Sequence, residues 1–270
     1  SSANFTITGL YFKNMTVSAK YAILSPINLT NEDIEHLKSF YDAEIRYVDY
    51  LLDNFINNLK KLGILDNTII IIIGDHGEIF GSHGRLIRLG LVRGAFYDEI
   101  IHIPLIIRHP YIKKTKKIDG LVEAIDVTPT ILDFLDIPTN KETQGRSLLP
   151  MINGSNETLH EYVFSGAKFS GSKHFELFPY QTIQSAIRSK QWKLIFERSI
   201  SGGFSNLELY NLENDPNENF NIVVERPEIA RLLKNRLMEW EEYAVKFRQL
   251  KQINLTDEEL RAAREAGYFE

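Results

Sequence analysis

Five consecutive isoleucines, Ile69–Ile73, constrain the fold of this chain more than any other feature, because they stop abruptly at Gly74-Asp75-His76-Gly77. The run is too short to cross a membrane and too apolar for a strand with one face in water. It predicts a buried strand of a sheet that is covered on both faces. In open α/β sheets, ligands bind just beyond the carboxyl ends of such strands, which is where Asp75 and His76 lie.

The Asp75-His76 pair has two interpretations on its residues alone. A carboxylate and an imidazole are a common pair of metal ligands, and the neighbouring glycines allow unusual backbone angles and close approach. A turn in which Asp75 accepts hydrogen bonds from backbone donors explains the same residues. Because the motif is short, both interpretations stay open at this point.

Composition narrows the class of protein. The 270 residues suffice for one large domain or two smaller ones, and 43% hydrophobic with 25% charged residues is ordinary for a soluble globular protein. A net charge of -5 gives no argument for nucleic-acid binding, and no apolar stretch reaches the length of a membrane span. The absence of cysteine excludes disulfides, thiolate metal sites and a cysteine nucleophile within these residues, and slightly favours a cytoplasmic location.

The region before the isoleucine run predicts a long helix. Thr30 and Asp33 have the spacing of a capping box, apolar residues then recur in steps of three and four as far as Leu62, and Gly63 ends the pattern. A helix followed by a buried strand is an αβ unit, so the fold class expected is α/β.

The rest of the chain predicts two parts. Residues 100–107 form an apolar segment with Pro104 inside it, which favours a strand near an edge of the sheet. A helix is expected over Thr128–Leu135, and polar residues near 139–160 mark a boundary between domains of residues 1–158 and 159–270. In the second domain we expect antiparallel strands over residues 162–164, 182–188, 192–197 and 207–211, and then a helix from about Pro227 to Phe247.

An ordered series of motifs resembles the C-terminal part of a sulfatase, in the alkaline phosphatase superfamily. The segments that carry the resemblance are residues 41–49 (YDAEIRYVD), 65–68 (LDNT), 74–78 (GDHGE), 81–84 (GSHG), 93–99 (RGAFYDE), 103–107 (IPLII), 126–130 (DVTPT), 145–148 (GRSL), 192–195 (WKLI) and 209–216 (LYNLENDP). Each segment is weak alone, but their order over about residues 30–245 is specific.

The resemblance implies both a fold and a chemistry. The fold is a mixed α/β sheet with flanking helices, followed by a small C-terminal domain with a four-stranded antiparallel sheet and a helix. The chemistry is metal-dependent hydrolysis of sulfate esters, on a small molecule or a glycan, by a hydrated formylglycine. Asp75 and His76 match two ligands of the metal. Arg93 falls where many members have a sulfate-binding lysine, and His83 is either a substrate-side group or a structural part of its glycine loop.

Two departures from the family pattern affect the chemistry. Many calcium-type sulfatases carry asparagine where this chain has His76, and imidazole suits manganese or zinc better than calcium, so the metal stays open between Ca²⁺ and Mn²⁺ or Zn²⁺. Arg93 keeps the positive charge and offers a bidentate fork to sulfate oxygens, but its high pKa makes it a poor proton donor.

The family's Asp-Asp metal pair and its Cys/Ser-x-Pro-Ser-Arg nucleophile motif are not found in these 270 residues. We therefore expect a C-terminal fragment of a longer enzyme, with half a metal site, no nucleophile and no turnover alone. The catalytic residue stays unknown. Exposed sheet edges favour self-association or pairing with an upstream fragment.

Two other functions stay open. One is a phosphodiesterase or phosphonate monoester hydrolase of the same superfamily, because phosphate and sulfate esters share their shape and the Asp-His pair suits both. The other is a non-catalytic binding protein that keeps the fold. The residues do not name the sulfated substrate, the oligomeric state or the compartment.

Overall fold

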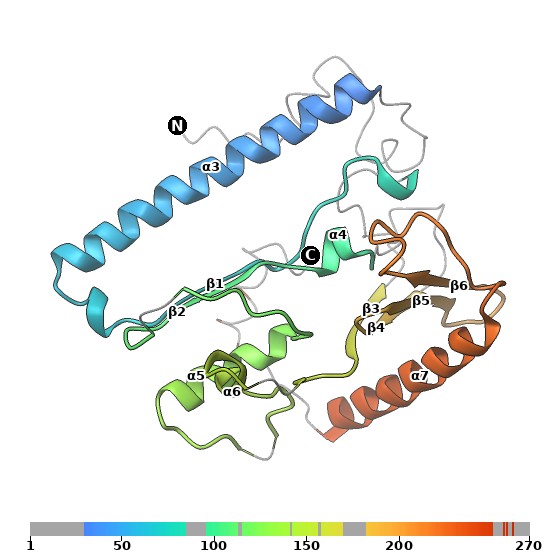
Figure 1. Cartoon of the computed structure of the whole chain (residues 1–270). Coiled ribbons are helices and arrows are strands. Elements are labelled where there is room, and N and C mark those ends of the chain that lie inside the picture. Colours follow the sequence, from blue (N-terminus) through green and yellow to red (C-terminus); the bar gives the residue numbers. More distant parts are fainter. Residues whose placement is uncertain are drawn as a thin grey trace.

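The computed structural model describes residues 30–84, 96–112, 115–140, 142–155, 158–169, 182–250, 256, 258 and 261. In chain order the helices and strands are α3 (Asn31–Lys61), η1 (Leu65–Asn67), β1 (Ile70–Ile73), η2 (Ser82–Gly84), α4 (Asp98–Ile101), β2 (Leu105–Arg108), η3 (Ala124–Asp126), α5 (Val127–Phe134), α6 (Leu149–Ile152), β3 (Val163–Phe169), β4 (Thr182–Arg188), β5 (Trp192–Ser199), β6 (Ser205–Asn211) and α7 (Pro227–Leu250). Figure 1 shows their arrangement.

The long predicted helix is confirmed as α3. Thr30 caps it: the Asp33 amide donates to Thr30 Oγ1 at 3.1 Å, and the Thr30 amide donates to Asp33 Oδ2 at 2.9 Å, which completes the capping box. Leu37 is the one buried residue of the helix. Half of its apolar stripe faces solvent, with Ile45 and Phe55 more than 50% exposed. An apolar stripe on a helix normally packs against other elements. Because much of this stripe is exposed, α3 contributes little to the core among the residues described.

The isoleucine strand is present as β1, but the prediction that both of its faces are covered is wrong. β1 pairs antiparallel with β2, with Ile70 opposite Arg108 and Ile73 opposite Leu105. The two strands form a two-stranded sheet on their own, and Ile73 and Ile106 are 40% and 59% exposed. The strand is therefore half-exposed, because the described residues supply no layers that cover both of its faces. Pairing with β2 satisfies the backbone groups along one edge of β1 without such layers.

The segment of residues 100–107 also differs from its prediction. Its first part belongs to the short helix α4, and the strand begins only at Leu105, directly after Pro104. Proline lacks an N–H donor, so the strand starts where ladder hydrogen bonding becomes available. The helix predicted over Thr128–Leu135 is confirmed as α5. Helix α6 lies within the polar region near residues 139–160 where the domain boundary is predicted, and it buries Met151.

The C-terminal part has the predicted architecture. Strands β3, β4, β5 and β6 form one antiparallel sheet in chain order. Helix α7 lies along one face of it (Figure 1). The core on that face consists of Ile187, Leu194, Phe196 and Leu209 from the strands and Ala230, Leu233 and Leu237 from the helix. The division into domains at residue 158 stays a prediction.

The opposite face of this sheet holds the segments that follow β1 and precede α4. Ile79, Phe96 and Tyr97 pack there against Ala186, Ile195 and Tyr210. Ile79 is fully buried and Tyr97 is 6% exposed. The C-terminal sheet therefore serves as a platform for the residues that come after the Asp75-His76 turn.

A buried ion cluster fastens α4 to this platform. Lys193 on β5 has no exposed side-chain surface, and its Nζ lies 2.8 Å from Asp98 Oδ1 and 2.7 Å from Glu218 Oε1. Glu218 Oε2 accepts a hydrogen bond from the Asp98 amide at 2.6 Å, and Arg188 pairs with Asp98 at 3.2 Å. Two carboxylates and two cations therefore balance within one buried site, which is the condition for burying charge at a tolerable free energy.

The cluster makes stability depend on pH through Asp98. Burial alone raises the pKa of Asp98, but Lys193 and Arg188 outweigh burial and hold this pKa below its usual value of 3.8. The ionised form therefore stabilises the fold above the usual pKa, and this contribution is lost as pH falls through the lower folded pKa. Burial raises the pKa of Glu218 even though Lys193 opposes the shift. The ionised form of Glu218 therefore costs stability above its usual pKa, and this cost disappears as the pH falls.

We predict that Asp98→Asn lowers the free energy of unfolding by about 2 kcal/mol at pH 7, because it removes a charge-assisted contact. The gap between variant and wild type should shrink as the pH falls from 4 to 2.5. Thermal unfolding followed by circular dichroism across this range measures both. A gap that stays constant with pH would contradict the role given to the Asp98 carboxylate.

Candidate metal-binding turn and substrate-facing loop

The predicted metal ligands lie together at the end of β1. His76 Nε2 is 3.4 Å from Asp75 Oδ2, and the His76 amide donates to Asp75 Oδ1 at 3.0 Å. The Asp75 side chain is 70% exposed and the His76 side chain 28% exposed. Asp75 therefore does cap a backbone donor, as the structural interpretation expected, and its second oxygen still faces the imidazole.

The hydrogen bond at Nδ1 determines the tautomer of the His76 imidazole. His76 Nδ1 is 2.8 Å from the Gly77 carbonyl oxygen, and a carbonyl only accepts, so Nδ1 carries a proton. In the neutral ring, Nε2 then carries a lone pair directed beside Asp75 Oδ2. At 3.4 Å the two atoms are in contact range, and either a proton on Nε2 or a cation bound to both atoms would make the contact attractive.

The spacing of the two acceptors suits a metal ion. Two ligands about 2.1 Å from one tetrahedral ion lie about 3.4 Å apart. Ligands about 2.4 Å from Ca²⁺ at a right angle are separated by about the same distance. The observed 3.4 Å therefore fits a shared cation but does not choose between a calcium and a transition-metal site. The Gly77 carbonyl would orient the imidazole ligand, as outer-shell acceptors commonly do.

Gly77 is required where the turn meets the backbone that leads into β2. Its amide donates to the Ile100 carbonyl at 2.7 Å, and a Cβ at this position would overlap the Glu99 carbonyl oxygen. At Gly74, by contrast, a Cβ would meet only the side chain of Pro104, at 3.1 Å, and that of Ile103. The close approach at Gly77 fixes the turn that carries both candidate ligands.

We expect Gly77→Ala to lower the free energy of unfolding by about 1–3 kcal/mol, because the methyl group must push a backbone carbonyl aside. Gly74→Ala is the matched control and should cost clearly less, since a proline ring can shift slightly. Chemical denaturation of both variants measures the difference. Equal losses at the two glycines would show that the Glu99 carbonyl does not limit the turn.

The predicted substrate-side residue His83 lies in the loop after the turn, in the left-handed region with φ 55° and ψ 23°. Its ring stacks on that of Tyr97, with centroids 3.6 Å apart and planes 5° apart. The neighbouring Ser82 hydroxyl donates to the Glu99 carboxylate. His83 is therefore brought to the same platform as Ile79 and Tyr97. The other predicted substrate-binding residue, Arg93, lies outside the described residues.

A second group of acidic residues and a histidine, which the sequence patterns do not predict, lies before β3. Ligand atoms of Glu123, Asp126 and His160 lie within 4.8 Å of one another, the one group of this kind among the residues described. His160 Nε2 contacts Asp126 Oδ2 at 2.9 Å, and the Arg146 amide donates to Asp126 Oδ1 at 2.8 Å. The Phe164 amide donates to Glu123 Oε1 at 2.7 Å.

These hydrogen bonds explain the group without an ion. Asp126 is fully buried, its Oδ2 also accepts from the Glu123 amide, and both oxygens are therefore used. Burial raises the pKa of Glu123, with the neighbouring Asp126 adding to that shift. The group ties the start of α5 to the residues that enter β3. We interpret it as a structural junction, because a metal ion would have to displace several backbone donors.

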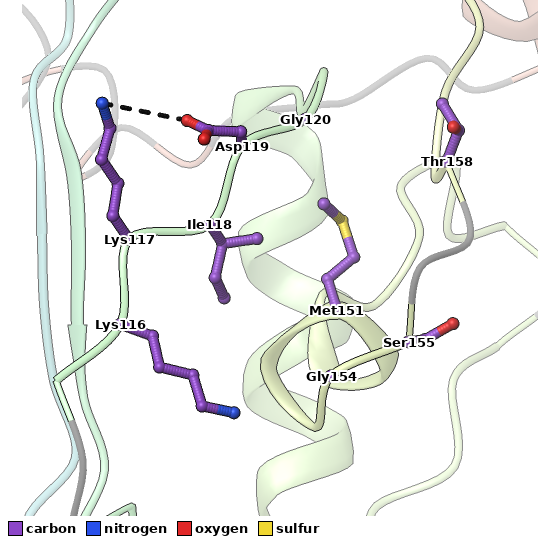
Figure 2. Close-up of a pocket in the computed structure, with 9 residues that line it drawn as sticks. All are labelled: Lys116, Lys117, Ile118, Asp119, Gly120, Met151, Gly154, Ser155 and Thr158. Atoms are coloured by element: carbon purple, nitrogen blue, oxygen red, sulfur yellow. Dashed lines mark ion pairs between the residues drawn. The ribbon is translucent and has the colours of Figure 1, made fainter.

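A pocket of about 330 Å³ lies apart from both groups, between residues 116–120 and the end of α6. Figure 2 shows two lysines at its rim. Lys116 Nζ donates to the Ile152 carbonyl at 3.3 Å, and Lys117 Nζ is 3.9 Å from Asp119 Oδ1. Lys116 therefore contacts a carbonyl at the end of α6, and the exposed Lys117–Asp119 pair contributes little to stability. Neither contact points to a ligand.

Comparison with known families decides the classification. The family model for the C-terminal region of N-sulphoglucosamine sulphohydrolase matches residues 92–243, and the sulfatase family model matches residues 9–137. The chain belongs to the sulfatase family. Bovine (Bos taurus) arylsulfatase K is 30% identical to this sulfatase chain over 219 residues, which cover 77% of the chain and 37% of the relative. The chain thus spans well under half the length of this curated relative.

Solved structures agree with this classification. A protein in complex with its substrate, D-glucosamine-2-N,6-O-disulfate, is 28% identical, with a TM-score of 0.57 over 73% of this chain and 39% of the other. A phosphonate monoester hydrolase from Silicibacter pomeroyi is 26% identical, with a TM-score of 0.65 over 87% and 47%. The sulfatase chain therefore has part of the alkaline-phosphatase-like fold that was predicted. Within the residues described, no helix is long and apolar enough to cross a membrane.

Proposed function

We propose that this chain supplies half of the metal site and one wall of the substrate site in an enzyme that hydrolyses sulfate esters. The observation that carries the proposal is the pair of acceptors, Asp75 Oδ2 and His76 Nε2, 3.4 Å apart after β1. In a sulfatase chain this pair is suited to a divalent ion. The ion would act as a Lewis acid toward the sulfate oxygens.

The residues of the chain itself have separate tasks in this proposal. Asp75 and His76 hold the ion, and the Gly77 carbonyl keeps the imidazole in the tautomer that binds through Nε2. Arg93 binds sulfate oxygens, and His83 borders the substrate. The Cys/Ser-x-Pro-Ser-Arg motif that would supply formylglycine is not found in these 270 residues, so we place the nucleophile elsewhere in the complete gene product. Whether the ion is Ca²⁺, Mn²⁺ or Zn²⁺ is part of what must be measured.

A sulfated glycan is the substrate class we favour. The support is the related structure solved with a glucosamine carrying two sulfates. The second candidate function is phosphonate monoester hydrolysis, and the related hydrolase from Silicibacter pomeroyi is the observation that favours it. The two functions share an ester with a tetrahedral anionic group, so the metal-binding turn alone does not separate them.

The test uses protein expressed from the complete coding sequence. Hydrolysis of an aryl sulfate, an aryl phosphonate monoester and a sulfated glucosamine is measured before and after chelation and after adding back Ca²⁺, Mn²⁺ or Zn²⁺. We expect sulfate-ester hydrolysis that is lost with the metal and restored by one of the ions. Phosphonate turnover that exceeds sulfate turnover would favour the second function, and turnover of none would favour a binding protein. The 270-residue chain alone should hydrolyse none of the three.

A further inference from the structure

His83 needs an external support to keep its conformation. A non-glycine residue at φ 55° is uncommon and costs roughly 1–2 kcal/mol relative to ordinary backbone. Its ring lies flat on Tyr97, with the centroids 3.6 Å apart. The position of the imidazole therefore depends on where the Tyr97 ring is held.

Tyr97 is held by a carboxylate from a distant part of the chain. Its hydroxyl donates to Glu208 Oε2 at 2.8 Å, and the two residues are 111 positions apart. The Tyr210 hydroxyl donates to the same oxygen at 2.8 Å, and Asn206 Nδ2 donates to Glu208 Oε1 at 2.8 Å. Burial and the Glu208 carboxylate raise the pKa of Tyr210, so this phenol stays protonated and remains a donor. Three donors converge on one carboxylate, which makes it a stiff anchor.

Ile79 links this anchor to the metal-binding turn. It lies three residues after His76, is fully buried, and packs in the same core as Tyr97 and Tyr210. The loop from the turn to His83 is thus held to the C-terminal sheet in two places, by an apolar side chain and by a ring stack. Such double attachment restricts how far His83 can move relative to Asp75 and His76.

We propose that Tyr97 and Glu208 are positioning residues of the sulfate-ester site: Glu208 fixes the Tyr97 ring, and the ring fixes the imidazole of His83 beside the substrate. This inference rests on the proposed function. It adds that strand β6, through Glu208, controls the geometry of the loop that carries His83. Neither residue needs to touch the substrate. Displacing a group by about 1 Å costs up to roughly a hundredfold in rate when that group orients a substrate.

Three variants test the Glu208–Tyr97 and Tyr97–His83 contacts separately. Tyr97→Leu removes the stacking ring, Tyr97→Phe removes only the hydroxyl that reaches Glu208, and Glu208→Gln removes the charge that orders the donors. Tyr162→Phe is the matched control, because Tyr162 packs on the opposite face of the sheet with the α7 core. All are made in the complete gene product.

Two measurements are required for each variant. The NMR resonances of the His83 ring report stacking, because an aromatic ring shifts protons above its face upfield. Steady-state kinetics with a sulfate ester report kcat and KM separately. We expect Tyr97→Leu to lower kcat/KM by about ten- to a hundredfold and to move the His83 resonances downfield. Tyr97→Phe and Glu208→Gln should give smaller falls in kcat/KM with broadened His83 signals, and Tyr162→Phe should change neither.

The outcomes distinguish the two levels of the proposal. If wild type hydrolyses the ester but Tyr97→Leu leaves kcat/KM unchanged, the positioning role is wrong while the proposed function stands. The positioning role is equally wrong if the His83 resonances do not move in Tyr97→Leu. If wild type hydrolyses no sulfate ester, the proposed function fails and the positioning role fails with it.

Discussion

Replacing Lys193 with alanine is expected to lower the free energy of unfolding by about 3–5 kcal/mol, because it removes the cation shared by the buried Glu218 and the partly buried Asp98. Lys193 Nζ lies within 2.8 Å of both, and its side chain has no exposed surface. Arg188 still pairs with Asp98 but makes no ion pair with Glu218 among the contacts described. Urea denaturation at pH 7 measures the loss.

The surface residue Lys190 supplies the control. It is exposed in the turn between β4 and β5, so Lys190→Ala should change stability by less than about 0.5 kcal/mol. Adding Glu218→Gln to Lys193→Ala should recover part of the loss, because the charge that lost its partner disappears. If the single Lys193 variant were as stable as wild type, the cluster would not be what fastens α4 to the sheet.

Substituting Asp75 or His76 by alanine should lower kcat/KM for a sulfate ester by at least about a hundredfold in the complete gene product. Loss of even an outer-shell group at a metal site typically costs ten- to a hundredfold in affinity or activity, and these are proposed direct ligands. The metal concentration needed for half-maximal activity should rise in parallel. Metal-titrated kinetics measure both effects, and Mn²⁺ binding followed by electron paramagnetic resonance gives a reading that does not depend on turnover.

Glu123→Gln tests the competing location for the ion, at the group of Glu123, Asp126 and His160. This variant should leave the metal requirement unchanged, because hydrogen bonds already use the oxygens of that group. The assignment of the metal to the Asp75-His76 turn would be overturned if Glu123→Gln abolished metal binding and Asp75→Ala did not.

Local patterns predicted most of the elements correctly. Helix α3 follows from its capping box and its spacing of apolar residues, and strands β3–β6 and helix α7 follow from composition within each segment. These features depend on neighbours a few residues away, which a sequence displays directly. The placement of Asp75 and His76 just after a strand follows for the same reason.

Contacts between distant residues could not be predicted in this way. The isoleucine run alone does not reveal that β1 pairs antiparallel with β2, or that Ile73 is 40% exposed. No local signal links Tyr97 to Glu208, 111 residues away, or His160 to Asp126, 34 residues away. His160 and Asp126 become neighbours only in the folded chain, so no local pattern marks them as partners.

The linear order of residues thus established the family, the elements and the Asp75-His76 pair, since periodicity and short motifs are local properties. The folded arrangement established what surrounds that pair. It set the 3.4 Å spacing of the two acceptors, the close approach at Gly77 and the attachment of the His83 loop to the C-terminal sheet. The burial of a side chain, and its distance from residues far away in the sequence, are set only when the chain packs, because both depend on which other elements lie around it.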